Sequence, residues 1–337
     1  MPIRYLQTEI HVAQPVVIEE GIVLLRLPLP FALNHINTYL LDESDGWTLI
    51  DCGLDCESGR QAWEVALSSP LLRGRPIRRI LLTHHHPDHI GLAGWLSLRF
   101  DAPMLITAGE HAVAGRYADP TRDVVTERLM FWREHGLPDD VAAWLLGRMP
   151  RYSQHVHPLP QNVEFVDSKQ PVRLGGRPWQ PIIGRGHSPE HLSLFDASGE
   201  ILISGDQILP KITPNISVWP GGDLNPLQSF LDSLNRFVGL GRDPRVLPSH
   251  KQVFHGLDRR ATELKHHHEE RLRHLADACV HPATCFELLP ALFGRTLRNE
   301  ELGFGLGEGV AHLNYLEGRS VLASRLDEQG VRRYLTA

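Results

Sequence analysis

The run His84-His85-His86-Pro87-Asp88-His89, directly after the apolar segment Ile80–Thr83, constrains the fold more than any other feature of this sequence. It is typical of a loop at the carboxyl end of a strand, where α/β sheets carry their chemistry. Alternation along an extended chain sends His84 and His86 to one side and His85 to the other. We therefore expect His84 and His86 to converge on one metal ion, without His85.

The second half of this run points to a second ion. Asp88 and His89 follow the bend at Pro87 and precede a helix predicted from Ile90. Imidazole and carboxylate groups suit zinc, and also iron or manganese, and two such ions close together can hold a hydroxide as a nucleophile. A polar capping loop with surface histidines is the alternative, which four ligand-type residues at this spacing disfavour.

One loop cannot complete two coordination spheres, so further ligands must come from elsewhere in the chain. Three more ligand-type residues each stand where an apolar, strand-like segment stops: His187, Asp206 and His250. The chain must therefore fold so that several strand ends meet.

Short apolar runs, many of them rich in β-branched residues, predict two groups of strands. The first group is Ile22–Leu27, Thr38–Leu41, Thr48–Ile50, Ile80–Thr83 and Met104–Thr107, and the second is Gln180–Ile183, Leu192–Phe195, Ile201–Ser204 and Val246–Leu247. Helical spacing in Ser58–Ser68 and Ile90–Phe100 predicts helices that cover the first group. This order indicates an α/β fold.

Two further regions flank or interrupt these strands. Residues of about 108–160 are rich in aromatic side chains at helical spacing, which is broken at Gly136–Pro138 and again at Pro150. They predict a helical insert of two or three helices. The insert is either an ordinary packed element or a roof over a substrate pocket. Residues 257–337 begin with a charged helix, Leu257–Ala278, and Ser320–Ala323 fits a short strand of a wing. We therefore expect a catalytic domain at 1–256 and a small, mainly helical C-terminal region at 257–337.

Composition limits the classes of partner. The net charge of −6 offers no general attraction for nucleic acid, and acidic and basic residues nearly balance in the C-terminal region. A packing or dimerising appendage is thus expected there, and a homodimer remains an option. Four cysteines without a CxxC pair predict reduced thiols. Neither a signal peptide nor an apolar run of membrane-spanning length stands out, so a cytoplasmic protein without membrane contacts is expected.

Four motifs carry a resemblance to a known family: Thr83–His89, Gly186–His191, Ser204–Asp206 and Pro248–His250. In this order, over about residues 20–256, they resemble the motif series of the metallo-β-lactamase superfamily. The resemblance implies a four-layer αββα metallo-β-lactamase fold, with the helical insert and the C-terminal region as additions. That region resembles the helical, winged-helix-like appendage of some thioesterase-like and ribonuclease-like members.

The resemblance also implies the role of each site residue. The implied ligands are His84, His86 and His187 for one ion and Asp88, His89 and His250 for the other, with Asp206 bridging both. Asp51 resembles the aspartate that supports a ligand loop by hydrogen bonding, with a plain turn residue as the alternative. His191, four residues after His187, is placed in the surroundings of the ligands rather than among them.

The reaction follows from the branch of the superfamily. Position 206 holds aspartate where some lactamases have cysteine, and position 86 holds histidine rather than glutamate, so the sequence is most similar to the glyoxalase II-like and thioesterase-like branch. This implies hydrolysis of a thioester, small ester or lactone by a metal-bridging hydroxide that Asp88 orients, with two divalent ions and zinc preferred. An RNA hydrolase and a mononuclear iron dioxygenase of the same fold are the alternatives.

Overall fold

The computed structural model describes residues 1–149, 151–156 and 158–337, so Pro150 and His157 of the expected insert lie outside the described residues. Within these ranges the strands form two seven-stranded sheets and one separate hairpin. The first sheet contains, in spatial order, β2 (Val16–Glu19), β3 (Ile22–Pro28), β4 (His35–Glu43), β5 (Gly46–Ile50), β6 (Ile77–Leu81), β7 (Met104–Ile106) and β8 (Val163–Phe165).

The second sheet joins the N-terminal strand to the second predicted group of strands. Its spatial order is β1 (Arg4–Tyr5), β14 (Phe254–His255), β13 (Arg245–Pro248), β12 (Ile201–Gly205), β11 (His191–Asp196), β10 (Arg177–Gly184) and β9 (Val172–Leu174). In each sheet, one central pair of strands is followed by candidate site residues, and its two strands run parallel: β5 with β6 and β12 with β13. Their carboxyl ends therefore lie at the same edge of each sheet.

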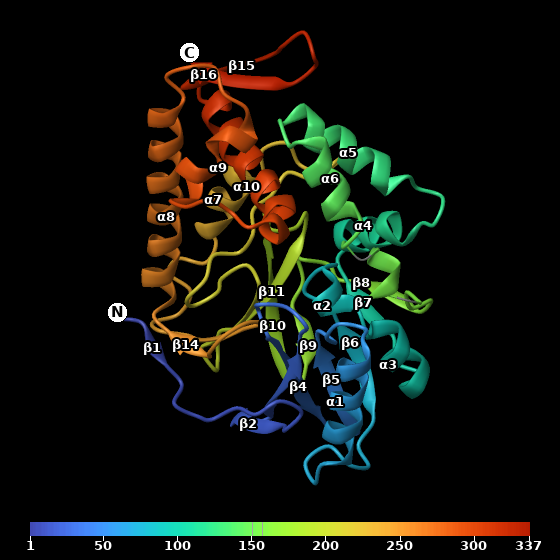
Figure 1. Cartoon of the computed structure of the whole chain (residues 1–337). Coiled ribbons are helices and arrows are strands. Elements are labelled where there is room, and N and C mark those ends of the chain that lie inside the picture. The colour runs from blue at the N-terminus through green and yellow to red at the C-terminus, as the bar shows by residue number, and fades with distance from the viewer. Residues whose placement is uncertain (150, 157) are drawn as a thin grey trace.

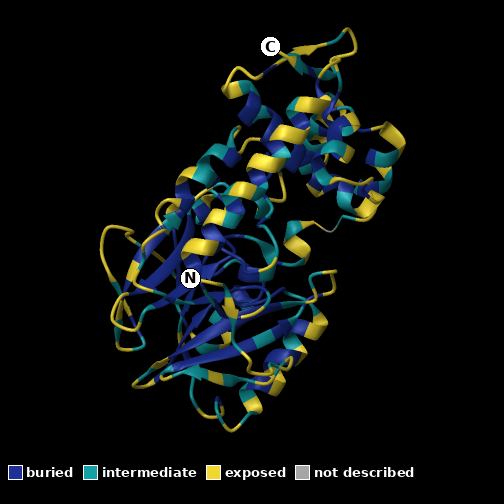
Figure 2. Cartoon of the chain, turned by 90° about the vertical axis from the view of Figure 1, so that its left-hand side faces the viewer, coloured by how far each residue is buried: buried dark blue, intermediate teal, exposed yellow. Residues whose placement is uncertain are grey.

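The alternation of side chains along the strands builds the layers. In β3, Leu24 packs between the sheets with Tyr39, whereas its neighbour Leu25 faces the outer side. On that outer side, Trp63 of α1 (Glu57–Ser68) and Leu96 of α3 (Ala93–Phe100) complete a second cluster. Helices α7 (Pro226–Leu234) and α8 (Leu257–Ala278) cover the opposite face of the second sheet. The predicted four-layer αββα fold is confirmed, and Figure 2 shows its buried strands between more exposed helices.

In its described residues, the expected insert contains three helices, α4 (Ala108–Ala118), α5 (Val124–Glu134) and α6 (Asp139–Leu146), followed by a 3-10 turn, η1 (Tyr152–Gln154). The helical conformation is interrupted between α5 and α6 at Gly136–Pro138, as the sequence predicts. Trp132 and Leu145 of the insert pack into the same cluster as the C-terminal helices. Figure 1 shows both parts standing at the upper end of the two sheets.

The C-terminal region consists of α8, α9 (Cys285–Phe293), α10 (Asn299–Gly318) and a hairpin of β15 (Leu322–Leu326) and β16 (Arg332–Thr336). The wing strand predicted at Ser320–Ala323 thus begins two residues later and is longer. Leu264 of α8 and Leu306 of α10 share one hydrophobic core with Leu202 and Val246 of the second sheet. The division of the chain after residue 256 stays a prediction, because this core crosses it.

One helix begins earlier than predicted. The helix expected at Ile90–Phe100 is two helices, α2 (Pro87–Ile90) and α3, so Asp88 and His89 lie inside the first turn rather than before it. Proline at the first helical position explains the start, since its φ suits a helix and its missing N–H is not needed there. The break follows at Gly91, where an added Cβ would lie 2.6 Å from the backbone nitrogen of Asp55.

Two simpler expectations concern the thiols and membrane spans. All four cysteines are free, as predicted, and Cys52, Cys279 and Cys285 are buried. Among the helices of the described ranges, none is long and apolar enough to cross a bilayer.

Candidate metal centre

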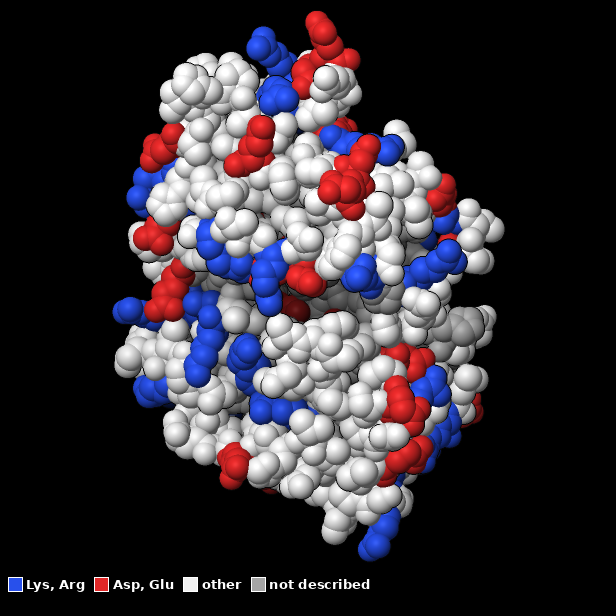
Figure 3. Space-filling model, viewed as in Figure 1, with Lys and Arg blue, Asp and Glu red and all other residues white. Residues whose placement is uncertain are grey.

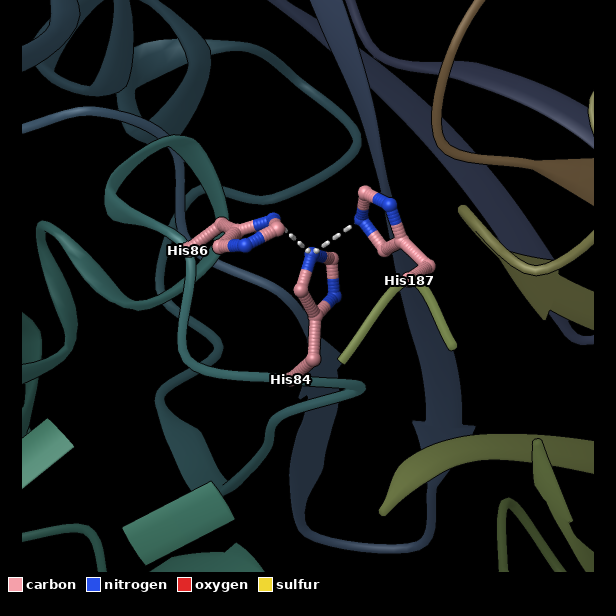
Figure 4. Close-up of side chains that lie close together, drawn as sticks. All are labelled: His84, His86 and His187. Atoms are coloured by element: carbon pink, nitrogen blue, oxygen red, sulfur yellow. Dashed lines mark hydrogen bonds between the residues drawn. The ribbon is translucent and has the colours of Figure 1, made fainter. Parts of the chain in front are cut away.

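Three histidines from two loops form the first donor set. Nε2 of His84 lies 3.0 Å from Nδ1 of His86 and 3.2 Å from Nε2 of His187, as Figure 4 shows. Burial, followed by the charges of neighbouring histidines, lowers the pKa of His84 and His86 well below its usual value, so both rings are neutral. Neutral imidazole is the form that binds a metal ion, and a cation satisfies all three nitrogens where one shared proton cannot.

The second donor set brings together Asp88, His89 and His250, whose ligand atoms lie within 4.8 Å of one another. Oδ2 of Asp88 is 3.3 Å from Nε2 of His250 and 3.7 Å from Nε2 of His89. Asp206 lies between the sets, because its Oδ2 is 3.6 Å from Nε2 of both His187 and His89 and its Oδ1 is 3.3 Å from Nε2 of His250. The structure thus gathers all seven residues that the sequence proposes as ligands.

The polar atoms of this centre fit a bound cation. Nε2 of His89 and Oδ1 of Asp206 are buried without a hydrogen-bond partner among the described residues. Such atoms are costly to bury unless another group satisfies them. Burial alone would lower the pKa of both His89 and His250. The carboxylates of Asp51, Asp88 and Asp206 outweigh it at His89 and raise its pKa well above the usual value, and those of Asp206 and Asp88 raise the pKa of His250 to about 10. The pocket therefore favours positive charge, which a divalent ion supplies.

Hydrogen bonds behind the histidines set which nitrogen faces the centre. Nδ1 of His187 donates to the carbonyl oxygen of Asn215 at 2.9 Å, and Nδ1 of His250 donates to that of His35 at 2.9 Å. A carbonyl oxygen only accepts, so each ring keeps a proton on Nδ1 and turns Nε2 toward the centre, where a bound cation would replace any proton on that nitrogen. Nδ1 of His89 bonds in the same way to Oδ2 of Asp51 at 2.8 Å.

Asp51 holds two segments of the site together. Its carboxylate accepts hydrogen bonds from the backbone N–H and the hydroxyl of Thr83, both at 2.8 Å, as well as from His89. The hydroxyl oxygen of Thr83, its proton donated to Asp51, lies 3.0 Å from Nδ1 of His84. Asp51 has a φ of 59°, a strained conformation that is common at functional sites. Its side chain is placed to orient one histidine of each set.

His191 lies beside the ligands and contacts the Asp206 loop. Its Nε2 accepts a hydrogen bond from the backbone N–H of Asp206 at 3.0 Å, and its ring is fully buried. Gly205, with a φ of 53°, passes so close that an added Cβ would lie 2.5 Å from this ring. The ring of His191 therefore shapes the turn that presents Asp206.

Replacing Gly205 with alanine is expected to destabilise the protein by about 1–3 kcal/mol and to weaken metal binding, since the backbone is left-handed there and His191 blocks the new methyl group. Urea unfolding with and without metal measures both effects. Gly330→Ala is the matched control, because Gly330 also has a positive φ of 78° but nothing lies within 4 Å of its Cβ position. Equal losses in the two variants would contradict the role given to His191.

Sequence reasoning missed Glu110, a fully buried carboxylate in α4. It accepts hydrogen bonds from Nδ1 of His85 at 2.5 Å, from the hydroxyl of Ser188 at 2.6 Å and from the backbone N–H of Glu190 at 2.7 Å. Glu110 thus ties the loop of His84 to the loop of His187. The one signal for it was its position four residues after the strand β7, at another strand end.

His85, His255 and His266–His268 contribute no atom to the two donor sets. His85 points to Glu110, and its carbonyl oxygen accepts a hydrogen bond from the hydroxyl of Tyr152 at 2.7 Å. Nδ1 of His255 contacts the carbonyl oxygen of Asp243 at 3.0 Å. Within the run 266–268, His268 is buried and the side chain of His266 is 63% exposed.

The molecular surface is hollowed near this centre. Figure 3 shows a hollow between the helical upper half and the sheets below, at about the level of α2 in Figure 1. Acidic atoms form part of its floor, and lysine and arginine side chains gather along its left rim.

Comparisons with known proteins agree with this architecture. The chain matches the family model "Metallo-beta-lactamase superfamily" over residues 32–250 and the model "Metallo-beta-lactamase-like, C-terminal domain" over residues 272–337. The probable metallo-hydrolase YqjP of Bacillus subtilis (strain 168) is 24% identical over 319 residues, which is 90% of this chain and 95% of that protein.

Two solved structures resemble the whole chain. A beta-lactamase domain protein from Burkholderia ambifaria is 34% identical, with a TM-score of 0.86 and 99% of both chains covered. A metallo-beta-lactamase family protein from Thermus thermophilus is 29% identical, with a TM-score of 0.82, and covers 95% of this chain and 100% of its own. Both likenesses include the C-terminal region.

Proposed function

The chain belongs to the metallo-beta-lactamase superfamily and is a metal-dependent hydrolase, and we propose that its substrate is a thioester or another small ester or lactone. The observation that carries the proposal is the convergence of two donor sets on Asp206. The proposed ligands are His84, His86 and His187 for one ion and Asp88, His89 and His250 for the other, with Asp206 shared. Zinc suits these donors best, with iron or manganese as alternatives.

Asp88 is the proposed catalytic residue. Bound cations would supply a nucleophile from water at neutral pH and stabilise the negative charge that develops on the carbonyl oxygen. The side chain of Asp88 is 21% exposed, against 10% for that of Asp206, so it is the more accessible carboxylate of the centre. Its Oδ2 faces His89 and His250, which leaves Oδ1 to accept the proton of the attacking water.

The surroundings favour a substrate with an apolar part. Tyr117 of the insert stacks on the ring of His85 at 5.9 Å, and Tyr117 and Tyr152 lie 5.7 Å apart. Aromatic side chains from the insert thus lie directly on the metal loop, which supports its role as the wall of an acyl pocket. Together with the net charge of −6, this favours a small ester over a nucleic acid.

This arrangement also supports placing the chain in the glyoxalase II-like and thioesterase-like branch. Asp206 contributes oxygen atoms to both donor sets, and His86 contributes a nitrogen to the first. We propose further that α8–α10 and the hairpin β15–β16 form the winged-helix-like appendage of that branch.

Metal analysis followed by a substrate panel tests this function. Protein purified without added metal is expected to contain close to two ions per chain and to hydrolyse acyl thioesters or lactones, with turnover lost after chelation and restored by metal. The panel also includes a phosphodiester, an RNA oligonucleotide and a β-lactam. A single iron with oxygen uptake would contradict the hydrolase. Cleavage of RNA without thioester or lactone turnover would instead contradict the proposal that the substrate is a small ester.

A further inference from the structure

The tautomer of His187 depends on a backbone carbonyl outside regular structure. Nδ1 of His187 donates to the carbonyl oxygen of Asn215 at 2.9 Å, which leaves Nε2 free for the first donor set. Asn215 lies in the long segment between β12 and α7, which has no strand or helix of its own. Such a segment needs contacts from elsewhere to hold its carbonyl groups in place.

Helix α10 of the C-terminal region supplies those contacts. The side-chain amide of Asn215 donates to Oε2 of Glu308 at 3.3 Å, across 93 residues of sequence. The hydroxyl of Ser217 donates to Oδ1 of Asn215 at 2.7 Å, so the amide is held at both ends. The backbone N–H of Val218 donates to the carbonyl oxygen of Gly307 at 3.0 Å. Segment 215–218 is therefore fixed to one turn of α10.

The close approach of α10 to this segment favours glycine at position 307. A Cβ added to Gly307 would lie 3.0 Å from Cβ of Ser217 and from the carbonyl oxygen of Val218. That distance is shorter than an ordinary contact between carbon atoms. A larger residue at position 307 would therefore push segment 217–218 away from α10 by a few tenths of an ångström.

Glu308 is itself held from a second C-terminal helix. Its Oε1 forms an ion pair with Arg271 of α8, and its side chain is only 9% exposed. Its backbone carbonyl accepts a hydrogen bond from Nδ1 of His312 at 2.8 Å, and Nε2 of His312 lies 3.0 Å from Nδ1 of the buried His268. A carboxylate fixed on this side is a rigid anchor for Asn215.

We propose that Glu308 is a positioning residue of the metal centre, acting through Asn215 on His187. The C-terminal appendage then also supports the metal centre, through the contact of α10 with Asn215. This inference rests on the proposed function, since it takes His187 as a ligand. Groups that orient a ligand histidine typically change metal affinity by about 10- to 100-fold when they are removed.

Metal binding by three variants of the full-length protein tests this role. Asn215→Ala removes the tether but keeps the ion pair of Glu308 with Arg271, Glu308→Leu removes both, and Glu308→Gln keeps an oxygen that can accept from Asn215. Glu301→Gln is the matched control, since Glu301 lies on the same helix and also pairs with arginine but is far from Asn215 in the hydrogen-bond network. Chelator competition gives the affinity for zinc, and ¹¹³Cd NMR gives one resonance for each ion.

The expected result separates positioning from general stability. Asn215→Ala and Glu308→Leu should weaken one of the two zinc sites by about 10-fold or more and shift the cadmium resonance of the all-histidine set. The other resonance should stay in place, Glu308→Gln should fall closer to the wild type, and Glu301→Gln should match it. Thermal melting of the metal-free proteins identifies any variant that fails to fold. If Glu308→Leu does not fold, the metal binding of Asn215→Ala tests the positioning role.

Three outcomes would contradict either the proposed function or the positioning role. If the wild-type protein binds fewer than two ions, the proposed function fails first, because the donor sets are then wrongly assigned. If the wild type binds both ions and Asn215→Ala binds them as tightly, with neither resonance shifted, Glu308 has no positioning role. Equal shifts of both resonances would also contradict it, because they indicate a general loosening of the protein.

Discussion

Changing Asp88 to alanine is expected to lower kcat/KM by about 100- to 10,000-fold, the range typical of losing a group that transfers a proton in the transition state. Burial alone would raise the pKa of Asp88, but the positive charges of His89 and His250 and a hydrogen bond from His250 lower it below its usual value. The carboxylate is therefore ionised at neutral pH and able to accept a proton. Hydrolysis of the best substrate from the panel, measured across pH, gives the size of the effect.

Asp88→Asn separates the two roles given to this residue. Asparagine keeps the size and one oxygen that can bind a cation but does not accept a proton, so metal content should fall less than turnover. Asp45→Ala serves as the control, because the side chain of Asp45 is 64% exposed and pairs with Arg78 away from the centre. Full activity of Asp88→Ala would show that the second donor set is wrongly assigned.

Replacing the buried carboxylate of Glu110 is expected to lower the free energy of unfolding more than the other substitutions proposed here. Burial alone would raise its pKa, but the charge of His85 and hydrogen bonds from His85, Ser188 and Glu190 lower it to about 2 from 4.5. This difference corresponds to about 3 kcal/mol of folding free energy. Glutamine at position 110 would place an NH₂ group, itself a donor, against neighbours that also donate hydrogen bonds. Glu110→Gln should therefore lower the free energy of unfolding by about that amount at pH 7.

The pH dependence of this loss has a definite sign. Because the pKa of Glu110 is lower in the folded than in the unfolded protein, its contribution is complete above about pH 5 and disappears as pH falls through about 2. Urea unfolding of the metal-free proteins should therefore give a difference between wild type and Glu110→Gln that is roughly half as large at pH 3 as at pH 7. Glu64→Gln, at an exposed ion pair with Arg99, should show almost no difference at either pH. A loss for Glu110→Gln that does not change with pH would show that charge is not the cause.

Local sequence patterns were sufficient for the central strands of both sheets and for the chemistry of the donors. The apolar runs predicted the central strands of both sheets, because burial on both faces leaves a continuous apolar signature. Alternation placed His84 and His86 together without tertiary information, since the spacing of side chains along an extended chain is fixed by its geometry. The start of α2 at Pro87 was missed because short apolar stretches do not mark helix ends to within a few residues.

The sequence by itself determined the fold class and the residue types able to bind a metal ion, because both depend on short-range periodicity and on strand ends. Only the tertiary structure decided what surrounds those residues. Glu110 meets Ser188 across 78 residues, and Asn215 meets Glu308 across 93. A single buried glutamate or asparagine has no periodic signature, and its partner depends on which helix packs against which loop. For the same reason, the sequence did not indicate that α10 packs beside the segment whose carbonyl group holds His187.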